Sequence, residues 1–237
     1  MQIVQETPNF VRLTRFRMIN CFLVREEDGC TLIDTNVFGS TGSILRASRD
    51  MGWPIRRIVL THAHFDHVGS LDELSKALPK AEVLIGEREA RLLQANFSLE
   101  AGEQGGKPLF GFLPVRTKPT RKLSDGEYIG SLRAVISPGH TPGHFSYFDI
   151  RDNTLIAGDA FATQTGLVAA GVFSWSFPFP ALFSWNVELC AHSAAKLRDL
   201  NPTRVAVGHG KTLASPAEAL DRAIALAFQQ HPDRSSL

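Results

Sequence analysis

Four side chains of metal-ligand type lie within six residues of each other, in the segment Thr61-His62-Ala63-His64-Phe65-Asp66-His67. Imidazole and carboxylate groups are ligands that Zn²⁺, Fe²⁺ and Mn²⁺ accept. The segment follows the short apolar run 57–60, so an extended backbone would let His62 and His64 face one ion. Asp66 and His67 come where the chain is expected to turn into a helix, which directs them toward a second ion. The alternative is a solvated polar loop, but random composition rarely produces such a cluster.

Three later residues of ligand type each lie beside a glycine at the end of a predicted strand. They are His140 in Pro-Gly-His-Thr-Pro-Gly-His (138–144), Asp159 in Gly-Asp (158–159) and His209 in Gly-His-Gly (208–210). Glycine permits a tight backbone turn beside a metal, where a side chain would collide. Strand ends at one sheet edge would bring these residues together. Each alone is as readily a core or capping residue, but together with the first cluster they are interpreted as ligands.

The number of candidate ligands is more than one ion needs. The set comprises His62, His64, Asp66, His67, His140, Asp159 and His209. Two ions that each take three protein ligands and share a further one account for seven. A structural zinc site takes four ligands and leaves no open position, whereas a catalytic site keeps one open. The surplus therefore favours a catalytic two-metal site.

The elements that must position these residues follow from hydrophobic periodicity and turn chemistry. Strands are predicted at 21–24, 30–33, 57–60, 82–85, 132–137, 145–150, 154–157 and 204–207, and helices at 44–51, 67–78, 87–97, 186–200 and 216–230. Ser215 is predicted to cap the last helix, with Pro216 at its first position and Glu218 completing a capping box. Residues 98–118 are rich in glycine and proline and are predicted to form a long loop. We predict two packed sheets with helices outside, in one domain over residues 1–237.

Taken together, these motifs resemble the metallo-β-lactamase superfamily. The similarity rests on His-x-His-x-Asp-His at 62–67, on the 138–144 element, on Gly158-Asp159 and on Gly208-His209, and it spans about residues 20–210. Leu-Ile-Asp-Thr at 32–35 fits the same order. The resemblance implies an α+β fold, the αββα sandwich, in which two mixed sheets pack together with helices outside.

The resemblance also implies a role for each residue. His62, His64 and His140 would bind one metal, Asp66, His67 and His209 the other, and Asp159 would bridge both. Asp34 would support the histidine loop without binding metal. His144 matches a position that is not a ligand, so it either supports the site, lines a pocket or is a packed structural histidine. His192 and His231 are interpreted as incidental.

The function implied is a metal-dependent hydrolase that cleaves an ester, lactone or thioester. The hypothesis is that a hydroxide shared by two divalent ions attacks a carbonyl carbon while Asp66 helps to move the proton. Zn²⁺ is expected, with Fe or Mn as alternatives. The chain resembles glyoxalase II and N-acyl homoserine lactonases more than true β-lactamases, because it has an aspartate at 159 and lacks a signal-peptide pattern. Two departures leave both activities open: Ala162 stands where lactonases usually have tyrosine, and only about 28 residues follow His209.

An aromatic, proline-containing segment at 161–185 gives an indication of the substrate. Phe161, Phe173, Trp175 and Phe177 are predicted to line an apolar pocket, because the segment begins directly after a candidate ligand. The loop at 98–118 would form the opposite wall. The equal alternative is a homodimer contact or a packed loop.

Two other functions stay open at this point: a mononuclear iron oxidoreductase of the persulfide dioxygenase type, and a metal-binding protein without turnover. The net charge of +1 and the lack of a basic run indicate no nucleic-acid or membrane partner, leaving a small-molecule substrate. Three cysteines without framework spacing indicate reduced thiols. Together with the lack of a signal peptide, they predict a cytoplasmic protein.

Overall fold

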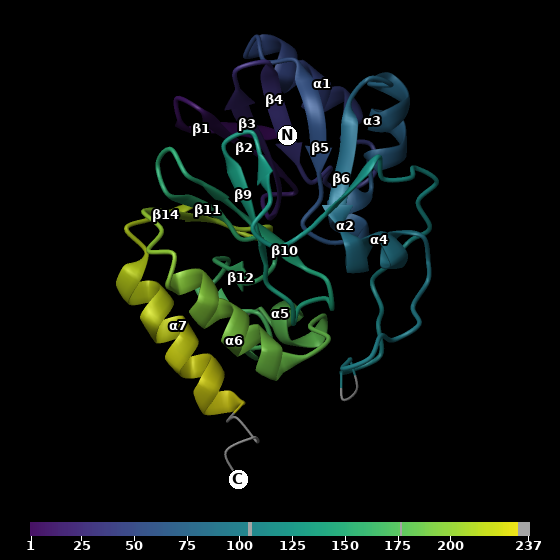
Figure 1. Cartoon of the computed structure of the whole chain (residues 1–237). Helices are drawn as coiled ribbons and strands as arrows, with labels where there is room; N and C mark the ends of the chain where they lie inside the picture. Colours follow the sequence, from purple (N-terminus) through teal and green to yellow (C-terminus); the bar gives the residue numbers. More distant parts are fainter. Residues whose placement is uncertain (104–105, 176, 232–237) are drawn as a thin grey trace. The chain divides into compact units, whose positions relative to one another are not determined.

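The computed structural model describes residues 1–103, 106–175 and 177–231, which form two compact units. Unit 1 comprises Met1–Asn96 and Gly111–Ser124, and unit 2 comprises Phe97–Phe110 and Asp125–Leu237. Each unit contains one large mixed sheet with its own helices (Figure 1). That residues 1–237 form one domain stays a prediction.

The sheet of unit 1 has seven strands in sequence order. They are β1 (Gln2–Thr7), β2 (Phe10–Arg15), β3 (Ile19–Glu26), β4 (Gly29–Ile33), β5 (Ile55–Val59), β6 (Glu82–Gly86) and β7 (Arg121–Leu123). The first four strands pair antiparallel, whereas β4 to β7 pair parallel. Parallel strands place their carboxyl ends at one edge of a sheet, where functional residues gather. The chain after β4 and the chain after β5 therefore come side by side there.

The helices of unit 1 differ from the sequence prediction at one place. They are α1 (Thr41–Asp50), α2 (Phe65–Val68), α3 (Leu71–Ala77) and α4 (Glu87–Leu93). The single helix predicted at 67–78 is therefore wrong: the chain forms two short helices separated by Gly69 and Ser70. At Gly69 an added Cβ would lie 2.7 Å from the backbone nitrogen of Phe38, so only glycine allows this close approach. The Ser70 hydroxyl donates to the Val37 carbonyl and accepts from the Ser40 amide, which holds the break in place.

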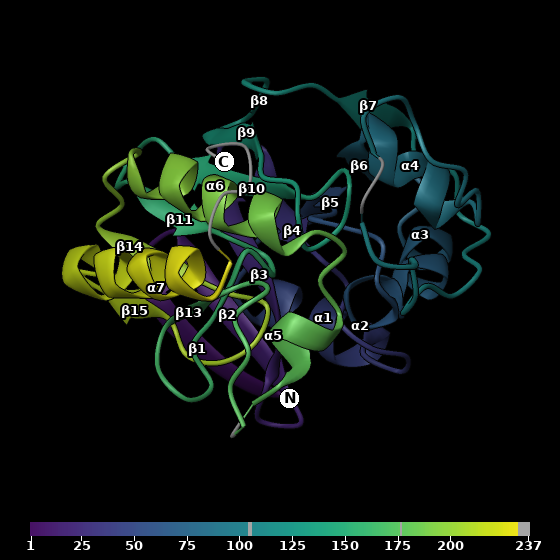
Figure 2. The ribbon, with the colours of Figure 1, turned by 90° about the horizontal axis from the view of Figure 1, so that it is seen from below.

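The sheet of unit 2 has six strands in the order β15-β14-β11-β10-β9-β8. Their bounds are β8 (Tyr128–Ile129), β9 (Leu132–Ile136), β10 (Phe145–Asp149), β11 (Thr154–Ile156), β14 (Arg204–Ala206) and β15 (Leu213–Ala214), and β12 (Phe161–Ala162) pairs separately with β13 (Val168–Ala169). Among the described strands of this sheet, only β11 and β14 pair parallel. Unit 2 also contains α5 (Phe179–Leu182), α6 (Val187–Arg198) and α7 (Ala217–Gln230). The last two helices lie side by side (Figures 1 and 2) and share a core with β11 and β14.

The two longest helices of unit 2 begin in different ways. Asn186 caps α6, because its side-chain oxygen accepts a hydrogen bond from the Leu189 amide at 3.1 Å. The predicted capping box of α7 is wrong. Ser215 adopts a positive φ of 48°, Pro216 occupies the cap position, and no side chain caps the helix.

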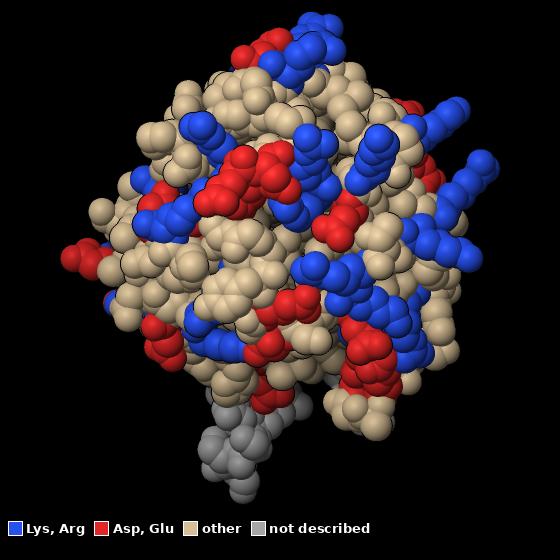
Figure 3. Space-filling model, turned by 45° about the horizontal axis from the view of Figure 1, so that its top comes forward, with Lys and Arg blue, Asp and Glu red and all other residues tan. Residues whose placement is uncertain are grey.

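The helices, the charged surface and the long loop can each be compared with the expectations from the sequence. In the described part of the chain, no helix is long and apolar enough to cross a membrane. On the face shown in Figure 3, basic and acidic side chains are intermixed. Within the described residues between α4 and β7, the chain forms neither helix nor strand, as predicted for the glycine-rich loop. The α+β class, with mixed sheets and helices, is confirmed.

Candidate metal centre

The histidine motif of unit 1 lies directly after β5, at the edge where the parallel strands end. His62 and His64 are buried, and Nε2 of His62 lies 3.1 Å from Nδ1 of His64. The other nitrogen of the first ring, Nδ1, lies 2.9 Å from the Thr61 hydroxyl. The His67 ring lies on the same side, with its centroid 4.1 Å from that of His62. The motif therefore converges within unit 1, as an extended segment that enters a helix should.

Asp34 fixes this motif from behind. It follows β4, is fully buried, and accepts hydrogen bonds from the Thr61 amide and the Thr61 hydroxyl, both at 2.8 Å. Its Oδ2 also lies 2.8 Å from Nδ1 of His67. A carboxylate can only accept, so His67 carries its proton on Nδ1 and its Nε2 lone pair is available to a metal. Asp66 is partly exposed, and its carboxylate lies 3.9 Å from that Nε2.

A buried glutamate that the sequence analysis missed also holds the motif. Glu89 is fully buried on α4, and its carboxylate accepts a hydrogen bond from the Ala63 amide at 2.9 Å. Ala63 lies between the first two histidines, so this bond fixes the backbone from which both side chains project. The sequence gives one indication of this role, because Glu89 lies on the apolar face of the helix predicted at 87–97. A carboxylate on that face is expected to be buried, and buried carboxylates rarely lack a partner.

Unit 2 gathers the remaining candidate ligands around one carboxylate. Oδ2 of Asp159 lies 3.1 Å from Nε2 of His209 and 3.4 Å from Nε2 of His140. The parallel pairing of β11 with β14 explains the first contact, because both residues follow the carboxyl ends of neighbouring strands. The Gly208 amide donates to the Gly158 carbonyl at 2.8 Å and extends this pairing to the site. Gly158 has a φ of 51°, which turns the aspartate out of the strand.

His144 does not reach this group of ligand atoms directly. It is fully buried, and its Nε2 accepts a hydrogen bond from the backbone amide of Asp159 at 3.1 Å. Its Nδ1 lies 2.9 Å from the hydroxyl of Ser137. Among the alternatives that the sequence left open, the structure favours support of the site from behind the carboxylate.

The aromatic segment packs against the histidines of unit 2. The ring centroid of Phe177 lies 6.3 Å from that of His209, and the Trp185 amide donates to the His140 carbonyl at 3.0 Å. Trp175 is 90% exposed and Phe173 is 40% exposed, with their ring centroids 5.0 Å apart. The segment therefore contains a pair of exposed aromatic side chains and a buried aromatic that contacts a candidate ligand.

One of the four aromatic residues predicted to line a pocket is almost completely buried. Phe161 is 1% exposed and belongs to the hydrophobic core of unit 2. That Phe161 lines a substrate pocket stays a prediction.

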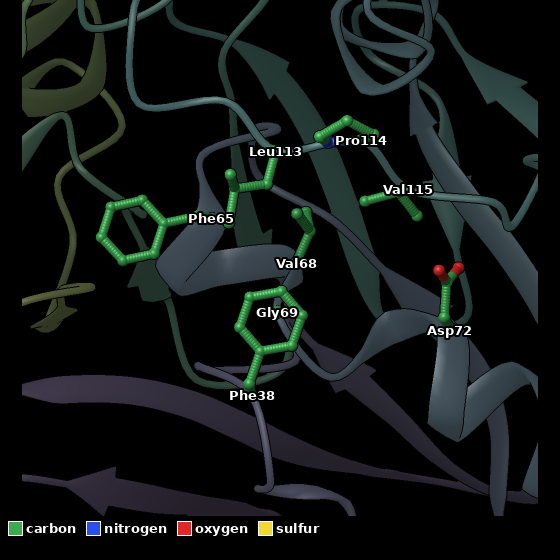
Figure 4. A pocket seen from close by; sticks show the side chains of 8 residues that line it. All are labelled: Phe38, Phe65, Val68, Gly69, Asp72, Leu113, Pro114 and Val115. Carbon is green, nitrogen blue, oxygen red and sulfur yellow. The ribbon is translucent and has the colours of Figure 1, made fainter.

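Unit 1 has an apolar pocket beside the histidine motif (Figure 4). Its lining residues are Phe38, Phe65, Val68, Gly69, Asp72, Leu113, Pro114 and Val115. The loop that supplies one side is attached to the motif, since the Phe65 amide donates to the Gly111 carbonyl at 2.9 Å. Asp72 fixes the same loop further along, because its carboxylate accepts from the Thr117 amide and hydroxyl. The second half of the glycine-rich loop is therefore held beside the histidine motif of unit 1, while the prediction that the loop forms the wall opposite the aromatic segment stays a prediction.

The spacing of the nitrogen and oxygen atoms in each unit suits a metal ion. Metal–ligand bonds of 2.0–2.1 Å at tetrahedral angles place two ligand atoms roughly 3.3 Å apart. The pair in unit 1 is separated by 3.1 Å, and the two pairs in unit 2 by 3.1 and 3.4 Å. In unit 2, both nitrogens near the Asp159 carboxylate are Nε2 atoms. In unit 1, the bond to Asp34 keeps the His67 proton on Nδ1, so Nε2 of His67 has a lone pair for a metal. The donor set of each unit therefore fits a divalent ion.

Comparisons with known proteins agree with this chemistry. A family model described as the metallo-β-lactamase superfamily matches residues 14–209. The chain is 49% identical to the protein YobT of Bacillus subtilis (strain 168), over 87% of this chain and 89% of YobT. It is 27% identical to a hydroxyacylglutathione hydrolase of Bartonella quintana (strain Toulouse), over 86% of this chain and 71% of that enzyme.

Solved structures show the same fold. The DIM-1 metallo-β-lactamase exposed to ceftazidime is similar with a TM-score of 0.72 and 15% identity, over 97% of each chain. The di-iron-bound form of TTHA1623 is similar with a TM-score of 0.64 and 27% identity, over 88% of this chain and 95% of that one. The chain therefore belongs to the metallo-β-lactamase superfamily, as its motifs predicted. It is a member of a class of metallo-hydrolases, and its histidines and aspartates include groups that could hold a metal ion.

Proposed function

We propose that the chain is a hydrolase that uses two divalent metal ions, most simply Zn²⁺, to cleave an ester, lactone or thioester. The observation that carries the proposal is the ligand-like spacing of nitrogen and oxygen atoms, 3.1 Å between two buried histidines of unit 1 and 3.1–3.4 Å around the Asp159 carboxylate in unit 2. One ion would be held by His62, His64 and His140, the other by Asp66, His67 and His209, with Asp159 shared. Two relatives support the two-metal hydrolase: one is named for hydrolysis of a hydroxyacylglutathione, and the solved structure of the other contains two irons.

The side chains have separate tasks in this proposal. Two divalent ions bound here would lower the pKa of a water molecule and polarise the scissile carbonyl. Asp34 and Glu89 hold the histidine loop rigid, so the ligand atoms need not reorganise when an ion binds. Asp66 is the least buried of the proposed ligands in unit 1, with a side chain that is 15% exposed. Its carboxylate could therefore take up the proton of the attacking hydroxide and pass it to the leaving group.

The substrate in this proposal has an apolar portion. Support comes from the exposed rings of Phe173 and Trp175, in the same segment as Phe177, whose ring contacts His209, and from the exposed ring of Phe65 within the histidine motif of unit 1. Each methylene that such a surface buries contributes about 0.8 kcal/mol. A hydrophilic acyl group would gain nothing from this surface, so the substrate class is an acyl ester, lactone or thioester with a hydrocarbon chain or ring.

Metal content is the first test. The protein is purified without added metal, reconstituted with Zn²⁺, and analysed by mass spectrometry together with His64→Gln, His209→Gln and the control His192→Gln, which alters an exposed histidine on α6. Two equivalents are expected in the wild type and control, and one or fewer in the other variants. Hydrolysis should follow the metal content and disappear with EDTA. One equivalent of iron with oxygen consumption and no hydrolysis would reject the proposal in favour of the oxidoreductase alternative.

Substrate preference is the second test. Nitrophenyl esters of increasing chain length are compared in the wild type, in Trp175→Ala and in Tyr128→Ala, an exposed aromatic on β8 that serves as control. A rise in KM that grows with chain length in the first variant alone is expected. An unchanged KM together with a loss of dimer in size-exclusion chromatography would assign the aromatic segment to a homodimer contact instead.

A further inference from the structure

A closed chain of hydrogen bonds in unit 2 begins and ends on the same backbone turn. It starts at the amide of Asp159, passes through His144, Ser137 and Ser146, and ends at the carbonyl of Ala157. The successive donor–acceptor distances are 3.1, 2.9, 2.8 and 3.3 Å. All three side chains are buried, with at most 1% exposure. The chain therefore encloses the 157–159 turn from which the Asp159 carboxylate projects.

The direction of every bond in this chain follows from its two ends. A backbone amide can only donate, so Nε2 of His144 accepts and the ring proton lies on Nδ1. A backbone carbonyl can only accept, so the Ser146 hydroxyl donates to Ala157. The Ser137 hydroxyl then accepts a hydrogen bond from Nδ1 of His144 and donates one to the Ser146 hydroxyl. With these directions every donor and acceptor in the chain has a partner, and no other assignment satisfies both ends. His144 is thereby held as the neutral Nδ1–H tautomer.

We propose that His144 is a positioning residue that sets the orientation of the Asp159 carboxylate through this chain. The proposal rests on the proposed function only in that Asp159 is taken as a metal ligand. Oδ2 of the carboxylate lies 3.1 and 3.4 Å from two Nε2 atoms, and a rotation of the turn would change these distances. Because Gly158 makes this turn permissive, restraints must come from outside the turn. The bond from the Gly208 amide holds the Gly158 carbonyl, and the bond that the Asp159 amide donates to His144 holds the residue that carries the carboxylate.

The tautomer is tested in the metal-free protein. Long-range ¹⁵N–¹H spectra of protein labelled at histidine are compared between the wild type and His144→Gln, which identifies the ring by its missing signals. A protonated Nδ1 and an unprotonated Nε2 are expected. Ser137→Ala should weaken the preference for this tautomer. A ring protonated on Nε2 would overturn the proposal, because it could not accept from the Asp159 amide.

The positioning role is tested by zinc affinity in competition with a chromophoric chelator. His144→Leu should lower the affinity by 10–100-fold, the usual effect of losing a partner behind a ligand. Ser146→Ala should lower it less, and His144→Gln should recover most of it, because an amide oxygen can accept from the Asp159 amide. Ser193→Ala is the matched control: it removes a hydroxyl that donates to the Pro138 carbonyl in the same unit, outside the chain.

The readouts separate positioning from general destabilisation. Urea unfolding is measured for each variant, and Ser193→Ala is expected to lose stability without losing zinc affinity. Unchanged zinc affinity in both His144→Leu and Ser146→Ala would overturn the proposal. If the first variant does not fold, the second and the glutamine variant decide. A wild type that binds no zinc would count against the proposed function alone, and the tautomer would still decide whether the chain of hydrogen bonds exists.

Discussion

Replacing Asp34 by asparagine tests whether one buried carboxylate sets the proton position on a ligand histidine. Asp34 accepts three hydrogen bonds, from the amide and hydroxyl of Thr61 and from Nδ1 of His67. Its φ is +60°, a conformation that asparagine tolerates as well as aspartate, so the backbone should not change. In Asp34→Asn one of the two acceptor oxygens becomes an NH₂ group. Either the Thr61 amide then meets a donor, or His67 must move its proton to Nε2.

The magnitude follows from these two outcomes. A buried donor left without its acceptor costs about 1–3 kcal/mol of folding free energy. The second outcome blocks Nε2 of His67, and loss of such a partner lowers metal affinity by about 10–100-fold, or about 1.4–2.8 kcal/mol. We expect the variant to fold with somewhat lower stability and to lose zinc affinity at the ion that His67 would bind.

The assay combines urea unfolding with chelator competition for zinc. Asp28→Asn is the control in the same unit, because Asp28 is exposed and pairs with Arg57 at the surface. That control should keep wild-type zinc affinity. Two tightly bound zinc ions in Asp34→Asn, with affinities equal to those of the wild type, would refute the reasoning about the tautomer.

Three further predictions concern other buried or restrained groups. Glu89→Ala leaves the Ala63 amide without its acceptor and should cost about 1–3 kcal/mol in urea unfolding, whereas Glu89→Gln should recover most of this. Burial raises the pKa of Asp72, but hydrogen bonds from Thr117 and from two backbone amides outweigh it and lower the pKa. Asp72→Asn should therefore cost about 1 kcal/mol at neutral pH, and the difference should vanish as pH falls through the lowered pKa; a difference that persists in strong acid would contradict this. Burial raises the pKa of all three cysteine thiols, to about 12 for Cys30 and Cys190, so iodoacetamide at pH 8 should label them only after unfolding, as read by mass spectrometry.

Long apolar runs and clustered ligands were predictable from the sequence. The runs that became β4, β5 and β6 are β-branched and buried, and the periodic segment of α7 ends at Gln230 as predicted. The ligand motifs were recognisable because histidine and aspartate cluster beside glycine at strand ends. These features depend on local residue types, which the sequence displays directly.

Features that depend on distant partners were not predictable. The break at Gly69 exists because residues 37–40 approach its backbone, and no local pattern reports that approach. The role of Glu89 depends on an amide 26 residues earlier. Strands of two residues, such as β8 and β12, are too short to show a periodicity, so pairing with neighbours defines them. Ser137 and Ser146 are ordinary strand-end residues until the chain that links them is visible.

The two units alternate along the sequence, and this order has consequences for folding during synthesis and for truncated fragments. Unit 1 is interrupted by residues 97–110, and its last strand, β7, is formed only at residues 121–123. During synthesis at about 5–20 residues per second, the outer edge of β6 waits roughly 2–7 s for that partner. An unpaired edge strand is a template for association with other chains. A fragment ending at Asn96 would carry this open edge permanently, so fragments cut there should aggregate, and slow translation across residues 87–120 should lower the soluble yield.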